Sequence, residues 1–269
     1  MTKSLLIGCG NLGQNIISGF YKKKNQILIC DVNKTLLKEI SKNYNNFFEV
    51  SANIKNISLR EIEYILLCIK PQQALEILKI ISHKKKGKIK IISFVAGLKE
   101  KIIRSFFDYN VEVIRIMPNL LLKVQKSTTG IFSYNLKVSE KEKIENIFSF
   151  FGKLIWLNKE SQMDFFTAFF GGGPAYLSFI FEIFSEILIK KGFNKKLSNE
   201  LVLILASGTV EIVGKSSNFE DVVKKVASKN GTTEKALNFL KKDRKLSSLI
   251  SKAISKAEER SVQISKDLL

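Results

Sequence analysis

The sequence predicts an α/β fold followed by an all-helical domain, and three observations carry this prediction. Short apolar runs alternate with amphipathic helical stretches from residue 1 to about residue 158. The first run, Leu5–Ile7, leads directly into the segment Gly8–Gly13, whose sequence is GCGNLG. After Asn158 long helical periodicities replace the strand-like runs. We therefore expect one domain over residues 1–158 and a second over residues 159–269.

The first domain is expected to be a parallel sheet with helices on both faces, which is a doubly wound sheet of the Rossmann type. Near-continuous apolar character over residues 64–69 and 89–95 suits strands that are buried on both faces. The expected strands are Ser4–Ile7, Ile27–Cys30, Phe48–Val50, Tyr64–Cys68, Ile89–Phe94, Val111–Ile116, Thr128–Phe132 and Lys153–Leu157. Helices are expected near residues 11–24, 33–43, 72–82, 99–107 and 139–151.

The glycine segment has the G-x-G-x-x-G spacing of a dinucleotide-binding turn. Gly8 would make the tight turn, Gly10 would let the backbone approach a pyrophosphate, and Gly13 would let helix and strand pack closely. The phosphates would lie on exposed N–H groups at the start of the helix, which includes Asn11 and Leu12. Glycine-rich turns without a ligand are common, but the strand before and the amphipathic stretch after favour a dinucleotide here.

Asp31 ends the second apolar run, where an acid accepts hydrogen bonds from the ribose hydroxyls of NAD. An acid there would repel the 2′-phosphate of NADP. Asn33 and Lys34 follow at once, and they could donate to that phosphate. The choice between NADH and NADPH therefore stays open at the level of sequence, as does a simple role for Asp31 as a helix N-terminal carboxylate.

The composition argues against several other classes of protein. The formal net charge is +19, but the lysines are scattered, so we expect no nucleic-acid partner. Cys9, Cys30 and Cys68 lack C-x-x-C spacing and are expected to be small apolar residues in a reducing compartment, with no metal site. No uninterrupted apolar run reaches the roughly 18 residues of a membrane span. We expect a cytoplasmic protein with no membrane partner.

The second domain is expected to consist of helices over Pro174–Leu188 and Leu197–Val213 and near residues 219–227, 232–242 and 246–267. The first two helices carry strongly apolar faces, which include Leu177, Phe184 and Leu205. A domain of this size does not easily bury such faces alone, so we expect a homodimer. The alternative is that these faces pack on each other or on the first domain.

Four segments are candidates for the chemistry. Cys68–Gln72, Ser93–Gly97 and Arg115–Asn119 each follow a predicted strand, at the sheet edge where open α/β folds bind ligands. Ala227–Thr233 precedes an amphipathic helix, whose free N–H groups and threonine hydroxyls suit a small carboxylate. Plain N-capping by Thr232 or Thr233 is the alternative for this last segment.

A single histidine, His83, lies in a basic turn, so no His-centred relay, Ser-His-Asp set or metal cluster is expected. This favours a hydride transfer that needs little proton management by side chains. Reduction of a protonated cyclic imine fits, because the iminium is already an electrophile when it binds.

Six segments together resemble pyrroline-5-carboxylate reductase, the last enzyme of proline biosynthesis, along the whole chain. They are Gly8–Gly13, Lys70–Gln72, Ala96–Gly97, Arg115–Asn119, Gly171–Tyr176 and Ser228–Thr233. The resemblance implies an NADPH- or NADH-dependent reductase with a helical domain that forms a homodimer, and it leaves a higher homo-oligomer open.

The resemblance also implies roles for individual residues. The cofactor would be contacted, beyond the glycine turn and Asp31, by Asn53, Ile69, Lys70, Pro71, Ala96, Gly97 and Asn119. Backbone N–H groups of Asn230, Gly231, Thr232 and Thr233 would hold the substrate carboxylate. The Thr233 hydroxyl would serve the ring nitrogen or the carboxylate, and Glu160 matches a position near the substrate.

The chain departs from the family pattern at Leu120, Leu121, Gly172, Lys229 and Asn230. Asn tolerates positive φ better than other non-glycine residues, so Asn230 is compatible with the shape of its loop. The departures keep two alternatives open. One is a reductase of another small cyclic imino or keto acid, and the other is a non-catalytic dinucleotide sensor.

Overall fold

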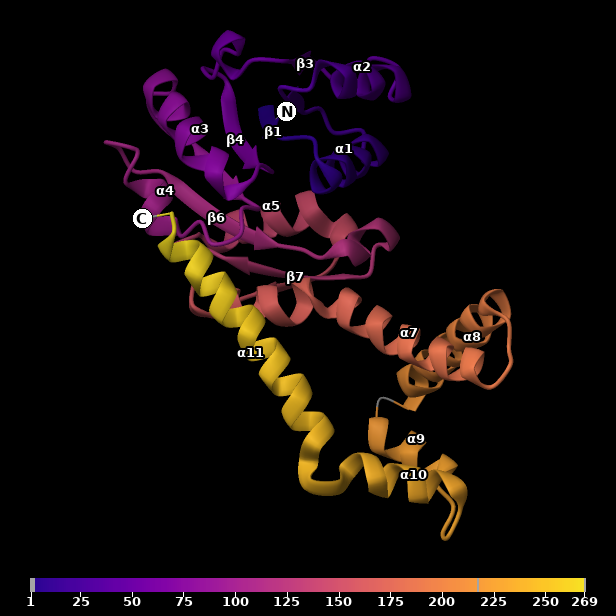
Figure 1. Cartoon of the computed structure of the whole chain (residues 1–269). Helices are drawn as coiled ribbons and strands as arrows, with labels where there is room; N and C mark the ends of the chain where they lie inside the picture. Colours follow the sequence, from indigo (N-terminus) through magenta and orange to yellow (C-terminus); the bar gives the residue numbers. More distant parts are fainter. Residues whose placement is uncertain (1–2, 217, 269) are drawn as a thin grey trace. The chain divides into compact units, whose positions relative to one another are not determined.

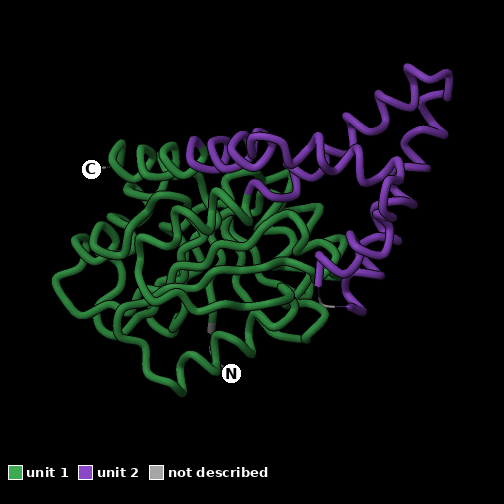
Figure 2. Tube along the Cα trace, turned by 90° about the horizontal axis from the view of Figure 1, so that it is seen from below, with its two compact units in different colours: residues 1–171, 257–269 green, residues 172–256 purple. Residues whose placement is uncertain are grey.

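The computed structural model describes residues 3–216 and 218–268, and the chain divides into two compact units (Figure 2). Unit 1 comprises residues 1–171 and 257–269, and unit 2 comprises residues 172–256. Unit 1 therefore takes in the end of the last helix, α11 (Lys245–Lys266). The expected division into functional domains at residues 158 and 159 stays a prediction.

Unit 1 is built on a sheet whose strand order is β3-β2-β1-β4-β5-β6-β7-β8 (Figure 1). The eight predicted strands are all found among the described residues. They are β1 (Lys3–Ile7), β2 (Leu28–Cys30), β3 (Val50–Ser51), β4 (Ile62–Leu67), β5 (Lys90–Ser93), β6 (Glu112–Met117), β7 (Ser127–Phe132) and β8 (Gly152–Trp156). Neighbours are parallel except β6 and β7, which are antiparallel.

The antiparallel pair departs from the uniformly parallel sheet that was expected. Residues 118–126 join β6 to β7 and contain only a 3₁₀ turn, Leu120–Val124. A parallel return needs a crossover of about a dozen or more residues, usually with a helix, and this connection is too short for one. β7 and β8 therefore extend the sheet beyond the classical six-strand order with reversed direction.

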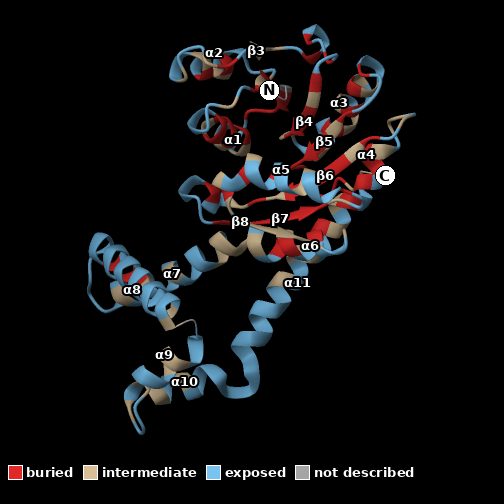
Figure 3. Cartoon of the chain, turned by 180° about the vertical axis from the view of Figure 1, so that it is seen from behind, coloured by how far each residue is buried: buried red, intermediate tan, exposed pale blue. Residues whose placement is uncertain are grey.

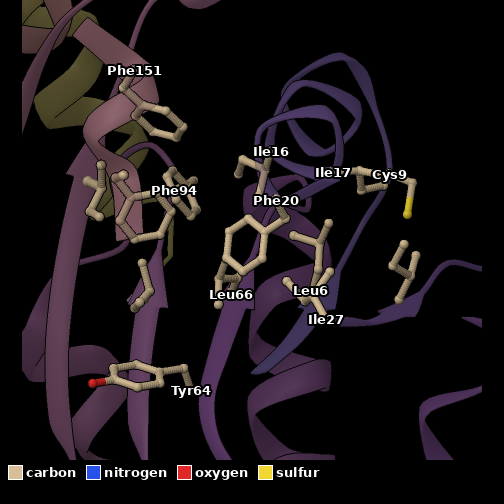
Figure 4. Close-up of a cluster of buried hydrophobic side chains, with 14 of the residues drawn as sticks. Leu6, Cys9, Ile16, Ile17, Phe20, Ile27, Tyr64, Leu66, Phe94 and Phe151 are labelled. Carbon is tan, nitrogen blue, oxygen red and sulfur yellow. The ribbon is translucent and has the colours of Figure 1, made fainter. Parts of the chain in front are cut away.

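Helices cover both faces of the sheet and bury two apolar clusters. Leu6 of β1 belongs to one cluster, and its neighbours Leu5 and Ile7 belong to the other, as the two-residue period of a strand requires. Figure 4 shows the first cluster, where Ile16 and Phe20 of α1 pack beside Leu6. The helices of unit 1 are α1 (Asn11–Lys22), α2 (Lys34–Asn43), α3 (Pro71–Lys84), α4 (Glu100–Arg104), α5 (Val138–Phe148) and α6 (Gln162–Phe166). The pattern did not predict α6 or the π-helical turn after it, Thr167–Gly171.

Unit 2 contains helices α7 (Gly173–Lys190), α8 (Lys195–Ser216), α9 (Phe219–Val226) and α10 (Thr232–Lys241), and the first part of α11. All five helices predicted for this part of the chain are present. α7 and α8 contact each other, and Ser185 Oγ donates to Asn199 Oδ1 at 2.7 Å.

Much of the apolar surface of α7 and α8 remains exposed in the single chain (Figure 3). Phe184 and Leu205 are 47% and 59% exposed. Gln162–Lys190 and Lys195–Ser216 are long and apolar enough to cross a membrane by length and composition alone, which is weak evidence for a span. Packing of the two helices on each other therefore accounts for only part of their apolar surface.

Candidate dinucleotide and substrate sites

The glycine turn after β1 has the geometry that its spacing predicts. Gly8 has φ +96°, and a Cβ there would overlap the carbonyl oxygen of Cys68. A Cβ on Gly13 would overlap the carbonyl oxygen of Gly8. The tight turn and the close packing are thus confirmed. A Cβ on Gly10 would meet no described atom within 4 Å, so this glycine faces open space.

The start of α1 is suited to an anion. Gly10 is the N-cap and supplies no side-chain cap, and the first turn carries no acidic residue. The first N–H group to close an intrahelical bond is that of Gln14, which donates to Gly10 O at 2.9 Å. The N–H groups of Asn11, Leu12 and Gly13 precede it at the positive end of the helix. This arrangement fits the pyrophosphate of a dinucleotide.

The strand-exit segments meet at one edge of the sheet, as expected. Ile7 pairs with Cys30 on one side and with Leu67 on the other, so β1, β2 and β4 end level with one another. Ser93 of β5 pairs with both Leu67 and Arg115. The strand order reverses between β1 and β4, and ligands of open α/β sheets bind at such a point.

Lys70, Pro71 and Ile69 lie on the β4 side of this crevice. Lys70 is the exposed N-cap of α3, and Pro71 occupies the first turn of that helix. A Cβ on Gly8 would lie 2.8 Å from Cγ2 of Ile69, so this side chain borders the glycine turn directly.

Asp31 is tied both to the glycine turn and to the N-cap residue of α2. Its Oδ2 accepts from the backbone N–H of Cys9 at 2.6 Å, and its Oδ1 accepts from the N–H of Asn33 at 2.8 Å. The N-cap of α2 is Asn33, whose Oδ1 accepts from the N–H of Leu36, and Lys34 is the exposed first residue of that helix. Asn53 is exposed after β3 and caps a 3₁₀ turn through the N–H of Lys55.

The three cysteines gather around the same turn as free thiols. Cys9 and Cys30 are buried, and Cys68 is half-buried. Burial, and next the charge of Asp31, raises the pKa of both Cys9 and Cys30. Burial also raises the pKa of Cys68. These thiols remain protonated at neutral pH and behave as small apolar side chains.

Ala96 and Gly97 lie in the connection from β5 to α4. Gly97 has φ +74°, which favours glycine. A Cβ on it would lie 2.7 Å from Cγ2 of Ile264 on α11. The resemblance implies that Gly97 contacts the cofactor, and the absence of a side chain there would suit a close approach. The structure adds a second reason, which is the close contact with the end of α11.

Two further predicted residues have defined partners inside unit 1. The Asn119 Oδ1 accepts from the N–H of Leu121, and its Nδ2 donates to Phe170 O at 2.9 Å. Oε1 of Glu160 lies 3.0 Å from Nη1 of the buried Arg115 and accepts from the N–H of Glu100 at 2.7 Å. Sequence reasoning missed the Arg115 pair, since no spacing along the chain links residues 115 and 160.

In unit 2 the predicted carboxylate cradle is the turn before α10. Asn230 has φ +62°, a positive φ that Asn tolerates better than other non-glycine residues, as expected. Its N–H donates to Glu234 Oε2 at 2.7 Å, and the N–H of Gly231 donates to Ser228 O at 3.0 Å. Gly231 is the N-cap and supplies no side-chain cap, so capping by Thr232 or Thr233 is not observed. The N–H groups of those two threonines, in the first turn of α10, have no partner among the described residues.

Comparisons with known proteins cover both units. Residues 160–264 match the family described as pyrroline-5-carboxylate reductase dimerisation, and residues 4–97 match NADP oxidoreductase coenzyme F420-dependent. A pyrroline-5-carboxylate reductase of Pasteurella multocida is 28% identical over 97% of this chain and 96% of its own length. One of Staphylococcus saprophyticus is 29% identical over 98% of each chain.

Solved structures agree with these matches in fold. A pyrroline-5-carboxylate reductase from Coxiella burnetii has a TM-score of 0.87 at 24% identity and covers 98% of each chain. The Plasmodium falciparum pyrroline carboxylate reductase, solved with NADP bound, has a TM-score of 0.81 at 24% identity and the same coverage. The matches to both parts of the chain, and the near-complete coverage of its relatives, lead to one conclusion: over nearly its whole length the chain is similar to pyrroline-5-carboxylate reductases.

Proposed function

We propose that the protein reduces 1-pyrroline-5-carboxylate to L-proline with a hydride from NADPH or NADH, the last step of proline biosynthesis. One observation carries the proposal, beside the similarity to pyrroline-5-carboxylate reductases. The chain keeps two helix N-termini with free N–H groups, one after the glycine turn in unit 1 and one at Thr232 in unit 2. The first suits the cofactor pyrophosphate, and the second suits the substrate carboxylate.

In unit 1 the proposed cofactor site follows the sheet edge. The N–H groups of Asn11, Leu12 and Gly13 hold the pyrophosphate, and Gly10 leaves room for it. The ribose lies by Asp31, with Asn33, Lys34 and Asn53 around it. The nicotinamide lies against Ile69, Lys70, Pro71, Ala96 and Gly97, and Asn119 shapes the exit of β6. When bound, the reduced nicotinamide supplies the hydride.

In unit 2 the proposed substrate site is the turn Asn230–Thr233. Asn230 and Gly231 use their N–H groups to shape the turn, and Thr232 and Thr233 offer theirs to the carboxylate. The Thr233 hydroxyl hydrogen-bonds the ring nitrogen or the carboxylate. The imine nitrogen is protonated before the hydride reaches its carbon, so the reaction needs no further proton from a side chain.

The assembly and location complete the proposal. The match to a dimerisation domain and the exposed apolar faces of α7 and α8 support a homodimer that takes a small-molecule substrate. A higher homo-oligomer remains a proposal. The buried free thiols are compatible with a reducing compartment, and we place the protein in the cytoplasm, with no membrane or nucleic-acid partner.

A steady-state assay tests the function. The purified protein is mixed with 1-pyrroline-5-carboxylate and either NADPH or NADH, and the loss of absorbance of the reduced nicotinamide is followed. We expect turnover with at least one cofactor and proline as product. Binding of dinucleotide without turnover would instead favour a sensor. Turnover of a different cyclic imino acid alone would point to the departures at Gly172 and Leu120.

A further inference from the structure

A single carboxylate oxygen, in the turn between β8 and α6, joins two elements of unit 1. Oε1 of Glu160 lies 3.0 Å from Nη1 of Arg115 on β6, and it accepts from the N–H of Glu100 at the start of α4. Arg115 is 3% exposed, so its charge is compensated inside the protein. Removal of one partner of such a pair leaves an uncompensated buried charge, which is strongly unfavourable.

Glu100 strengthens the same junction. Its side chain is fully buried, and its Oε1 accepts from Nε and Nη2 of Arg104 at 2.8 and 2.6 Å. Its Oε2 accepts from the N–H of Tyr134, which follows β7. The carboxylates of Glu100 and Glu160 thus balance the charges of Arg104 and Arg115 in one network. The backbone at Glu100 is held by its own side chain and by Glu160.

The consequence falls on the connection that carries Ala96 and Gly97. At its first end the N–H of Phe94 donates to Leu67 O at 3.0 Å. At its other end the N–H of Glu100 is held by Glu160. Between these ends Gly97 lies against Ile264 in a positive-φ conformation. The connection is therefore fixed at both ends, and at the second end Glu160 acts together with the Glu100 side chain.

We propose that Glu160 is a positioning residue, which holds Ala96 and Gly97 in place for the nicotinamide and does not touch the substrate. This inference rests on the proposed function for the role of Ala96 and Gly97. It replaces the expectation that Glu160 binds substrate. Oε1 of Glu160 already has two protein donors, Arg115 Nη1 on β6 and the backbone N–H of Glu100 on α4.

Two variants separate the alternatives. Glu160→Gln keeps an acceptor of the same shape but removes the charge, and Glu160→Ala removes both. The Kd of the reduced dinucleotide is measured without substrate through its fluorescence, and KM is measured for dinucleotide and imine. We expect Glu160→Ala to raise both dinucleotide constants about tenfold and leave the imine KM within about twofold. Glu160→Gln should raise the dinucleotide constants about threefold.

Glu145→Ala is the matched control, because Glu145 also accepts one side-chain hydrogen bond in unit 1, from Trp156 Nε1 at 2.6 Å. It should leave all three constants unchanged. If Glu160→Ala does not fold by circular dichroism, Glu160→Gln carries the test.

An imine KM that rises while the dinucleotide Kd stays constant would overturn the proposal and place Glu160 at the substrate. Unchanged constants in a folded Glu160 variant would overturn it as well. A wild-type protein that binds dinucleotide but does not reduce the imine would overturn the proposed function alone, because the Kd comparison still reports on Glu160.

Discussion

The Asp31 carboxylate accepts a 2.6 Å hydrogen bond from the backbone N–H of Cys9, so the end of β2 is tied to the middle of the glycine turn. A second bond from the N–H of Asn33 fixes the other oxygen. The carboxylate is thus held in one orientation at the position where a dinucleotide ribose is proposed to lie. A fixed negative charge there disfavours the 2′-phosphate of NADPH.

We therefore expect Asp31→Ser to shift the ratio of kcat/KM for NADPH over NADH upward by about tenfold or more. Ser removes the negative charge, and Lys34 is then left to attract the phosphate. Asp108→Ser, which removes an exposed acid elsewhere in unit 1 and changes the net charge by the same amount, serves as the control for altered overall charge. An unchanged cofactor ratio in Asp31→Ser would place the ribose elsewhere.

The three glycines of the turn predict three different phenotypes. Gly13→Ala should destabilise the fold by about 1–3 kcal/mol, because its Cβ would overlap the carbonyl of Gly8. Gly8→Ala should cost more, since it adds a positive φ to a similar overlap. Gly10→Ala should melt like wild type, because its Cβ enters open space, but it should bind dinucleotide weakly. Thermal unfolding and fluorescence titration check this order. A Gly10→Ala protein with normal affinity would contradict the proposed pyrophosphate position.

Sequence patterns predicted the elements well because apolar periodicity is local. The apolar periodicity of strands such as β4 and β5, and of helices such as α7 and α8, is visible within about a dozen residues. The reversal of β7 depends instead on the length of the connection from β6, and the ion pair of Arg115 with Glu160 joins residues that no local pattern links. The contact of Gly97 with Ile264 likewise joins residues that are far apart in the sequence. The glycine turn was readable because each glycine meets a local steric demand.

A charge cluster at the other end of the sheet predicts an acid-dependent contribution to stability. Burial alone would raise the pKa of Glu140, but hydrogen bonds from Lys143, Lys90 and Tyr64 lower it to about 2. A carboxyl whose pKa is lower in the folded state stabilises the fold above its unfolded pKa. That stability is lost as pH falls from about 4.5, the ordinary value, toward 2.

Glu140→Gln should therefore lower the unfolding midpoint near neutral pH and flatten its dependence on pH below about 4.5. Urea unfolding at several pH values measures both effects. Glu142→Gln, an exposed neighbour on α5, is the control. A slope below pH 4.5 equal to that of wild type would show that the cluster does not carry this linkage.

The exposed apolar face of α8 predicts a variant that separates the subunits. Ile204 is 60% exposed in the single chain and belongs to the segment that matches a dimerisation domain. Ile204→Glu would bury a charge in that interface, so we expect a monomer by light scattering and a lower melting temperature. Lys215→Gln on the same helix should remain a dimer. A dimeric Ile204→Glu protein would move the interface away from this face.

Thr233 provides the sharpest test of the proposed substrate site, because its hydroxyl and its backbone N–H are separable. Its N–H group lies in the first turn of α10, and the N-cap Gly231 supplies no side chain to compete for it. Thr233→Ala keeps that N–H but removes the hydroxyl. If the hydroxyl bonds the reacting ring, kcat/KM for the imine should fall by about 100-fold, while the dinucleotide Kd stays within about twofold of wild type. Thr233→Ser keeps the hydroxyl and should recover most of the activity. Equal losses in imine turnover and dinucleotide affinity would instead assign Thr233 to the structure of the turn.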